Sequence, residues 1–193
     1  MNSIQNFINK KPNNFSEESV LISTYFKICK LNSGWFLNTI NPPSGEWSKL
    51  ILRENTSQEP IEMSFSKNMR RLDLILQDEN NLNNFFLAEA KPNFQSLINQ
   101  IDKTDEVFRE QTDYINTILK IKINLIYGYI CGLQQNIIDN EVNLIKRYLN
   151  LSQFSENLIC ILVFRSEEKV DFKLIYPNNI KEVIKETFDK IFS

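Results

Sequence analysis

The chain has 193 residues, among them 24 acidic and 22 basic side chains and no histidine, and its formal net charge is −2. The lack of histidine excludes Ser-His-Asp and Cys-His catalysis, histidine-based nuclease sites and most zinc sites. The length predicts a single domain over residues 1–193. No apolar run approaches the ~20 residues of a membrane span, no secretory signal is visible, and the three cysteines stand in apolar surroundings. We therefore expect a cytoplasmic protein without a membrane segment.

The first part of the chain is predicted to be helical. A helix over residues 16–31 starts at a serine that can cap it. Turn clusters rich in Asn, Pro, Ser and Gly follow at 32–34 and 41–45. A second, short helix is expected over residues 45–54.

Two apolar strands come next, RRLDLIL at 70–76 and FFLAEAK at 85–91, joined by the polar turn QDENNLNN. Strand side chains alternate between two faces, so Glu89 and Lys91 share a face, and Asp73 lies opposite the three leucines of the first strand. The simplest connection is a hairpin, which brings Asp73 alongside Glu89.

The second half of the chain predicts alternating helices and strands. An amphipathic helix spans residues 95–120, and a buried strand at 123–132 suits a parallel crossover. A helix over 139–150, two strands at 157–165 and 170–177 joined by a charged turn, and a C-terminal helix complete the chain. That helix starts at Pro177-Asn178-Asn179, and its expected apolar stripe comprises Ile180, Val183, Ile184, Phe188 and Ile191. These elements predict an α/β fold with a central mixed β-sheet flanked by helices.

The hairpin carries the residues with a chemical signature. Two neighbouring carboxylates, Asp73 and Glu89, repel each other unless a cation lies between them. Hard oxygen ligands suit Mg²⁺, which binds through one or two carboxylates plus substrate phosphate and water. Lys91 would stand beside the metal and orient the attacking water or stabilise charge on the phosphate.

Asp73 in one apolar strand and Glu89-Ala90-Lys91 in the next resemble the PD-(D/E)XK nuclease superfamily, although Leu72 stands where the family name has proline. The superfamily includes many restriction endonucleases, Holliday-junction resolvases and RecB-type nucleases. The resemblance implies a restriction-endonuclease-like core and a Mg²⁺-dependent endonuclease, with Mn²⁺ as a substitute, that hydrolyses phosphodiester bonds in DNA. A restriction or phage-defence enzyme is the expected type. Asp73, Glu89 and the carbonyl of Ala90 would bind the metal, and Lys91 would position the water.

Two further positions are secondary candidates. Gln111 and Tyr114 on the long helix are similar to a shortened Gln and Tyr motif of RecB-type members, and an amide that caps a buried backbone group is the equal alternative. Many members of the superfamily also carry a Glu on the helix before the Asp strand. Glu46 is the best-placed match here, although the helix dipole alone also favours a Glu in a first turn. Its rivals are Glu17, Glu18 and Glu62.

An acidic chain that binds DNA needs local positive patches, because Lys and Arg neutralise phosphates and release counterions. The best candidates besides Lys91 are Lys67, Arg70, Arg71 and Lys103. Solvated strand-start charges are the alternative interpretation of Arg70 and Arg71. A homodimer or a partner subunit would supply more positive surface.

Two alternatives to a nuclease stay open. A Glu-x-Lys pair on a strand is common as an exposed ion pair, and an Asp some residues earlier can be coincidence. Against this, both acids interrupt apolar strands, where an unpaired carboxylate is costly. The second alternative is a non-catalytic nucleic-acid-binding or protein-interaction subunit with the same fold.

Overall fold

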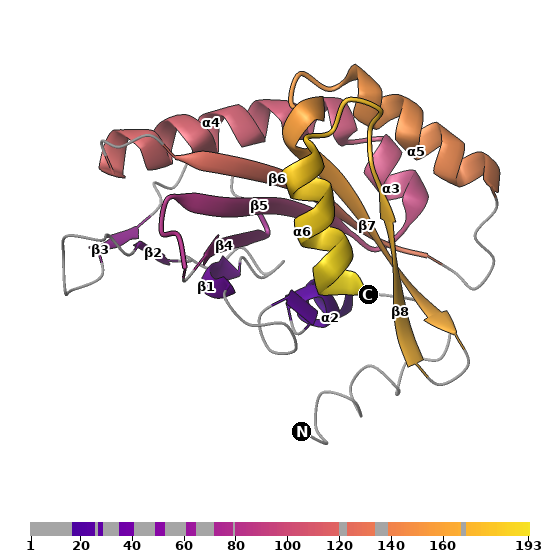
Figure 1. Cartoon of the computed structure of the whole chain (residues 1–193), viewed down its shortest axis with the longest axis horizontal. Coiled ribbons are helices and arrows are strands. Elements are labelled where there is room, and N and C mark those ends of the chain that lie inside the picture. The colour runs from indigo at the N-terminus through magenta and orange to yellow at the C-terminus, as the bar shows by residue number, and fades with distance from the viewer. Residues whose placement is uncertain are drawn as a thin grey trace.

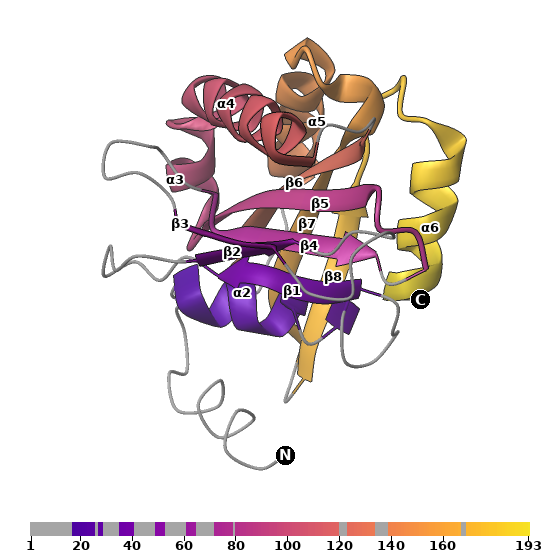
Figure 2. The same cartoon turned by 90° about the vertical axis from the view of Figure 1, so that its left-hand side faces the viewer.

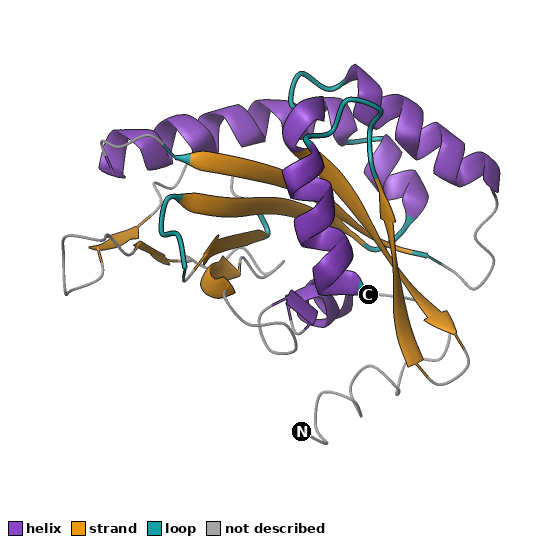
Figure 3. Cartoon of the chain, viewed as in Figure 1, coloured by secondary structure: helices purple, strands orange, loops and turns teal. Residues whose placement is uncertain are grey.

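The computed structural model of the chain describes residues 17–25, 27–28, 35–40, 49–52, 61–64, 72–78, 80–119, 123–133, 139–166 and 169–193. Within these ranges the chain forms a six-stranded mixed sheet flanked by helices (Figure 3), which confirms the predicted α/β class. None of the described helices is both long enough and apolar enough to cross a bilayer.

The main sheet has the strand order β1-β4-β5-β6-β7-β8. The neighbours β5 and β6, and β6 and β7, are parallel, and the other three pairings are antiparallel. The strands are β1 (Trp35–Ile40), β4 (Leu74–Asp78), β5 (Asn84–Lys91), β6 (Asn124–Gly132), β7 (Leu158–Ser166) and β8 (Lys169–Ile175). The expected hairpin of β4 and β5, the parallel crossover to β6 and the hairpin of β7 and β8 are thus all present.

Helices cover both faces of this sheet (Figures 1 and 2). One face carries α3 (Phe94–Ile98), α4 (Ile101–Leu119) and α5 (Asp139–Leu151), and its buried cluster includes Leu87, Phe108 and Tyr129. The other face carries α2 (Glu17–Tyr25) and α6 (Glu182–Phe192), and its cluster includes Phe86 and Phe188. A short 3-10 helix, η2 (Ser155–Asn157), connects α5 to β7. Because strand side chains alternate, β5 contributes Phe85 and Leu87 to the first cluster and Phe86 and Ala88 to the second.

The predicted short helix over residues 45–54 is wrong. Residues 49–52 form β2 (Lys49–Leu52), which pairs antiparallel with β3 (Ile61–Ser64) in a separate two-stranded sheet. A short apolar run such as Lys-Leu-Ile-Leu suits either state, and pairing with a second segment satisfies its backbone groups as a strand. The strand β1 was not predicted at all.

Two helices also differ from expectation. The long helix over 95–120 is interrupted at Asn99 and Gln100, where the N–H of Gln100 donates to the carbonyl of Leu97 instead of continuing the α-helical pattern. The last helix begins at Glu182, five residues after Pro177, and the N–H of its N-cap residue Lys181 donates to the carbonyl of Glu156. The first helix is α-helical over Glu17–Tyr25, residues 27–28 are π-helical, and the rest of the predicted range 16–31 lies outside the described residues.

Two details of the expected faces are wrong as well. Val183 is 66% exposed and does not join the buried stripe of α6. Leu72 packs into the α3–α5 cluster, whereas Leu74 and Leu76 pack into the α2–α6 cluster. The reason is that β4 begins at Leu74, so regular alternation does not extend back through Asp73 to Leu72.

Candidate functional site

The carboxylate of Asp73 lies against the backbone of β5. Leu74, the first residue of β4, pairs with Ala88, and Asp73 precedes it just outside the regular strand. The Oδ2 of Asp73 accepts a hydrogen bond of 2.7 Å from the backbone N–H of Ala90. Asp73 is 7% exposed, so its carboxylate is held at the entry of β4 against the backbone between Glu89 and Lys91.

Glu89 and Lys91 lie on one face of β5, two residues apart, as alternation predicts. The Nζ of Lys91 donates to the Oε1 of Glu89 at 2.7 Å, and their side chains are 9% and 15% exposed respectively. The pair therefore sits on the α3–α5 side of the sheet, close to water but mostly shielded from it. Asp73, bound to the N–H of Ala90, and the Glu89–Lys91 pair are three charged groups at the carboxyl end of β5.

Tyr129 lies directly beside this group. It is the register partner of Glu89 on β6, and it is fully buried. Its hydroxyl donates towards the carbonyl of Ile101 and the Oδ1 of Asp105, both at 3.2 Å. Burial, followed by the nearby Asp105 carboxylate, raises the pKa of Tyr129 far above its ordinary value of 10.0, so the hydroxyl stays protonated and acts as a donor.

Asp105 links this tyrosine to the end of α5. The hydroxyl of Ser152 donates to both carboxylate oxygens of Asp105, at 3.0 and 2.8 Å, and accepts the N–H of Phe154. The network joins β6, α4 and the α5–η2 connection behind Glu89. Sequence reasoning missed Tyr129, Asp105 and Ser152 as neighbours of the site. The one signal available was an aspartate on the sheet side of an amphipathic helix.

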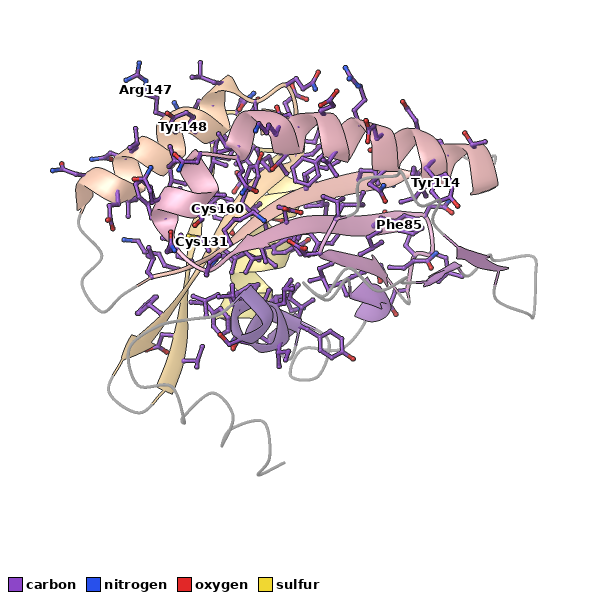
Figure 4. All side chains as sticks on the ribbon, turned by 180° about the vertical axis from the view of Figure 1, so that it is seen from behind. Phe85, Tyr114, Cys131, Arg147, Tyr148 and Cys160 are labelled. Carbon is purple, nitrogen blue, oxygen red and sulfur yellow. The ribbon has the colours of Figure 1, made fainter. Side chains whose placement is uncertain are left out.

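The two secondary candidates on α4 are placed differently. Gln111 is fully buried between Phe108 and Ile115, on the side of α4 that faces the sheet. The sheet face that α4 covers is the one that carries Glu89 and Lys91. Tyr114 is half-buried against the same cluster. Figure 4 shows Tyr114 above the Phe85 end of β5, whereas Cys131, the register partner of Lys91, lies towards the other end. The structure therefore does not bring Tyr114 to the three charged groups.

The remaining candidates divide between exposed and undescribed residues. Lys103 is exposed in the first turn of α4. Glu46, Lys67, Arg70 and Arg71 lie outside the described residues, so their roles stay predictions.

The donor set fits Mg²⁺ in kind. Asp73 and Glu89 supply hard carboxylate oxygens from neighbouring strands, and Mg²⁺ typically uses one or two carboxylates together with waters and phosphate. Within the described ranges no group of three or more His, Cys, Asp or Glu side chains is placed to hold a metal. A metal at this site would therefore depend on the two carboxylates, backbone oxygen, water and substrate.

The described cysteines do not form a second reactive centre. Burial raises the pKa of the Cys131 thiol to about 12, with a smaller contribution from Glu141, and burial also raises the pKa of Cys160 well above its ordinary value. Figure 4 shows both in the interior under the helices. Protonated buried thiols are poor nucleophiles and metal ligands, so these cysteines are core residues.

Comparisons of the chain with protein-family models, with curated proteins and with solved structures found no match.

Proposed function

We propose that the protein is a Mg²⁺-dependent endonuclease that hydrolyses phosphodiester bonds in DNA, with a restriction-endonuclease-like core. The observation that supports this proposal most is that Asp73, bound to the backbone of Ala90, and the Glu89–Lys91 pair lie mostly buried at the carboxyl end of β5. Burying such groups is costly and gives little net stability, so their presence on otherwise apolar strands favours a chemical role.

Each residue has a distinct task in this proposal. Asp73 and Glu89, with the carbonyl of Ala90, would hold the metal, and the N–H of Ala90 fixes the orientation of the Asp73 carboxylate. Bound Mg²⁺ polarises a phosphoryl oxygen and lowers the pKa of a bound water. Lys91 is held by Glu89 on the same face, from which its ammonium can orient the attacking water and stabilise charge on the phosphate.

The direct test is cleavage of plasmid and of oligonucleotide duplexes with Mg²⁺ or Mn²⁺. The variants are Asp73→Asn, Glu89→Gln and Lys91→Met, which keep size while removing charge. Each is expected to lower the cleavage rate by about 10²-fold or more, the typical loss for one preorganised electrostatic group. Glu182→Gln is the matched control, because the side chain of Glu182 is 69% exposed on α6. This variant should cleave DNA at the rate of the native chain.

Two results would contradict the proposal. Cleavage that persists at the native rate in all three variants would come from another site or from a contaminant. Cleavage unchanged by a chelator would exclude the metal. Melting curves of every variant are needed, because a variant that unfolds says nothing about chemistry.

One observation favours a second candidate, the non-catalytic nucleic-acid-binding or interaction subunit. The 2.7 Å ion pair between Lys91 and Glu89 neutralises both charges without any metal. DNA binding by the native chain without cleavage in either metal would support this candidate.

We further propose a cytoplasmic location, a role in restriction or phage defence, and a homodimer or partner subunit that brings two active sites to a duplex.

A further inference from the structure

The exposed side of α5 has an unusual composition for this acidic chain. Its exposed polar residues are two cations and three amides, namely Lys146, Arg147, Asn140, Asn143 and Asn150. Among the α5 side chains that the structure describes, the acidic one is Glu141, which is half-buried. We call these five exposed residues the α5 surface. Its charges are all positive, and the exposed leucines Leu144 and Leu151 lie on the same helix.

The other two long helices differ in this respect. On α4 the exposed charged residues are two basic and three acidic, namely Lys103, Arg109, Glu106, Glu110 and Asp113. On α6 they are two basic and three acidic, namely Lys185, whose side chain is 41% exposed, Lys190, Glu182, Glu186 and Asp189. Since both helices carry more acid than base, the positive character of α5 is not a general property of the described helical surface.

The α5 surface lies on the same side of the sheet as the candidate site. Glu141, in the first turn of α5, lies near Cys131, because its carboxylate contributes to the raised pKa of that thiol. Cys131 is the register partner of Lys91. Figure 1 shows α3, α4 and α5 together above the sheet, and Figure 4 shows Arg147 projecting outwards from α5. The α5 surface and the candidate site are therefore on the side of the sheet that α3, α4 and α5 cover.

We propose that the α5 surface binds the sugar–phosphate backbone of DNA next to the cleavage site. This inference rests on the proposed function for its choice of DNA. Lys and Arg side chains neutralise phosphates, while Asn side chains donate hydrogen bonds to phosphate and sugar oxygens without reading bases. From Asn140 to Asn150 the helix rises about 15 Å, which matches roughly four nucleotides of one strand at 3.4 Å each. The binding is independent of DNA sequence.

The test is the salt dependence of DNA binding, measured by fluorescence anisotropy with the native chain and a Lys146→Gln/Arg147→Gln variant. The probes are labelled 20-base-pair duplexes of two unrelated sequences, and a chelator prevents cleavage. Each lost phosphate contact reduces the steepness of the plot of log affinity against log salt concentration by about 0.9. In the double variant this slope should therefore be shallower by about 1.8. The same relation predicts roughly 60-fold weaker binding at about 0.1 M salt, for both sequences alike.

Two matched variants make the result specific. Lys185→Gln/Lys190→Gln removes the same charge from α6 on the opposite face and should keep the native slope. Lys146→Arg/Arg147→Lys keeps both charges and should restore affinity. The inference would be overturned if the slope is unchanged in the α5 variant or falls equally in the α6 variant. It would also be overturned if the native chain does not bind DNA, or binds RNA of the same length more tightly.

The cleavage assay separates this inference from the proposed function. If the native chain cuts DNA but the α5 variant binds normally, the nuclease stands and the α5 surface does not. If the α5 variant loses the predicted slope but the native chain never cuts, the surface stands as the DNA-binding face of a non-catalytic module.

Discussion

Replacing Lys91 with methionine tests whether the buried charges form a metal site or only an ion pair. The Nζ of Lys91 lies 2.7 Å from the Oε1 of Glu89, and the two side chains are 9% and 15% exposed. Met has a similar length and no charge. The substitution leaves Glu89 at the same depth without this ammonium beside it.

The expected loss of stability is sizeable. At an effective dielectric of about 20, charges at this distance attract by roughly 6 kcal/mol, most of which is offset by their desolvation. Removing one partner of a buried pair nevertheless costs about 3 kcal/mol or more, because the other charge stays behind. For a chain of this length that corresponds to a fall in Tm of roughly 6–12 °C. Lys185→Met is the control, since its pair with Glu182 spans 3.6 Å at 41% and 69% exposure and should contribute less than about 1 kcal/mol.

Magnesium then distinguishes the two interpretations of the pair. If Asp73 and Glu89 bind Mg²⁺, the ion can replace the missing ammonium and should raise the Tm of Lys91→Met more than that of the native chain. For a dissociation constant on the order of 1 mM, about 10 mM Mg²⁺ adds about 1.4 kcal/mol, or roughly 3–6 °C. Thermal melts with and without Mg²⁺ measure this directly. A Mg²⁺ shift no larger in Lys91→Met than in Lys185→Met would refute the metal site, and equal Tm values without Mg²⁺ would refute the burial argument.

Three further predictions concern packing and burial in the core on both faces of the sheet. In Gly128→Ala the new Cβ would lie under 3.0 Å from the ring of Phe86. Urea melts should therefore show that the free energy of unfolding falls by about 1–3 kcal/mol, and an added Phe86→Leu should partly restore it. An unchanged free energy of unfolding in Gly128→Ala would contradict this close approach. Tyr129→Phe removes a buried donor to a carboxylate and should cost about 1–3 kcal/mol in the same assay, whereas native stability would show that this hydroxyl contributes nothing. Because burial raises the thiol pKa of Cys131 to about 12 and that of Cys160 well above its ordinary value of 9.0, both should resist a thiol reagent at pH 8 until the chain unfolds. Their contribution to stability is complete below about pH 9 and falls by about 1.4 kcal/mol per pH unit and per group above it, so stability that is flat from pH 8 to 11 would contradict the assignment.

The core of the fold could be predicted because its signals are local. The β4–β5 and β7–β8 hairpins join apolar runs across short polar or charged turns, and the helix α5 repeats apolar residues at helical spacing. The hairpin brings Asp73 to the backbone of Ala90, and its predicted approach to the Glu89 carboxylate stays a prediction.

The missed strands depend on pairing with another segment, distant in sequence for β1 and nine residues further along the chain for β2. The strand β1 pairs with β4, which starts 34 residues after the end of β1, and β2 exists as a strand through its pairing with β3. The local pattern of an apolar run does not show which segment will pair with it. The length and flanking turns of residues 45–54 therefore suggested a helix where β2 lies, and no element was predicted at β1. The Tyr129, Asp105 and Ser152 network likewise spans 24 and 47 residues between hydrogen-bonding partners.

The burial of the three charged groups is itself an argument about function. Apolar side chains of similar size at Asp73, Glu89 and Lys91 would extend the core that Leu87 and Tyr129 already form, and replacing a buried ion pair in this way is often neutral or stabilising. Solvation alone does not explain the charges, because all three side chains are mostly shielded from water. A metal ion and a substrate phosphate would add partners to those that the Ala90 N–H and the Glu89–Lys91 pair already supply, and a site that gives up stability in this way is typical of chemistry rather than of packing.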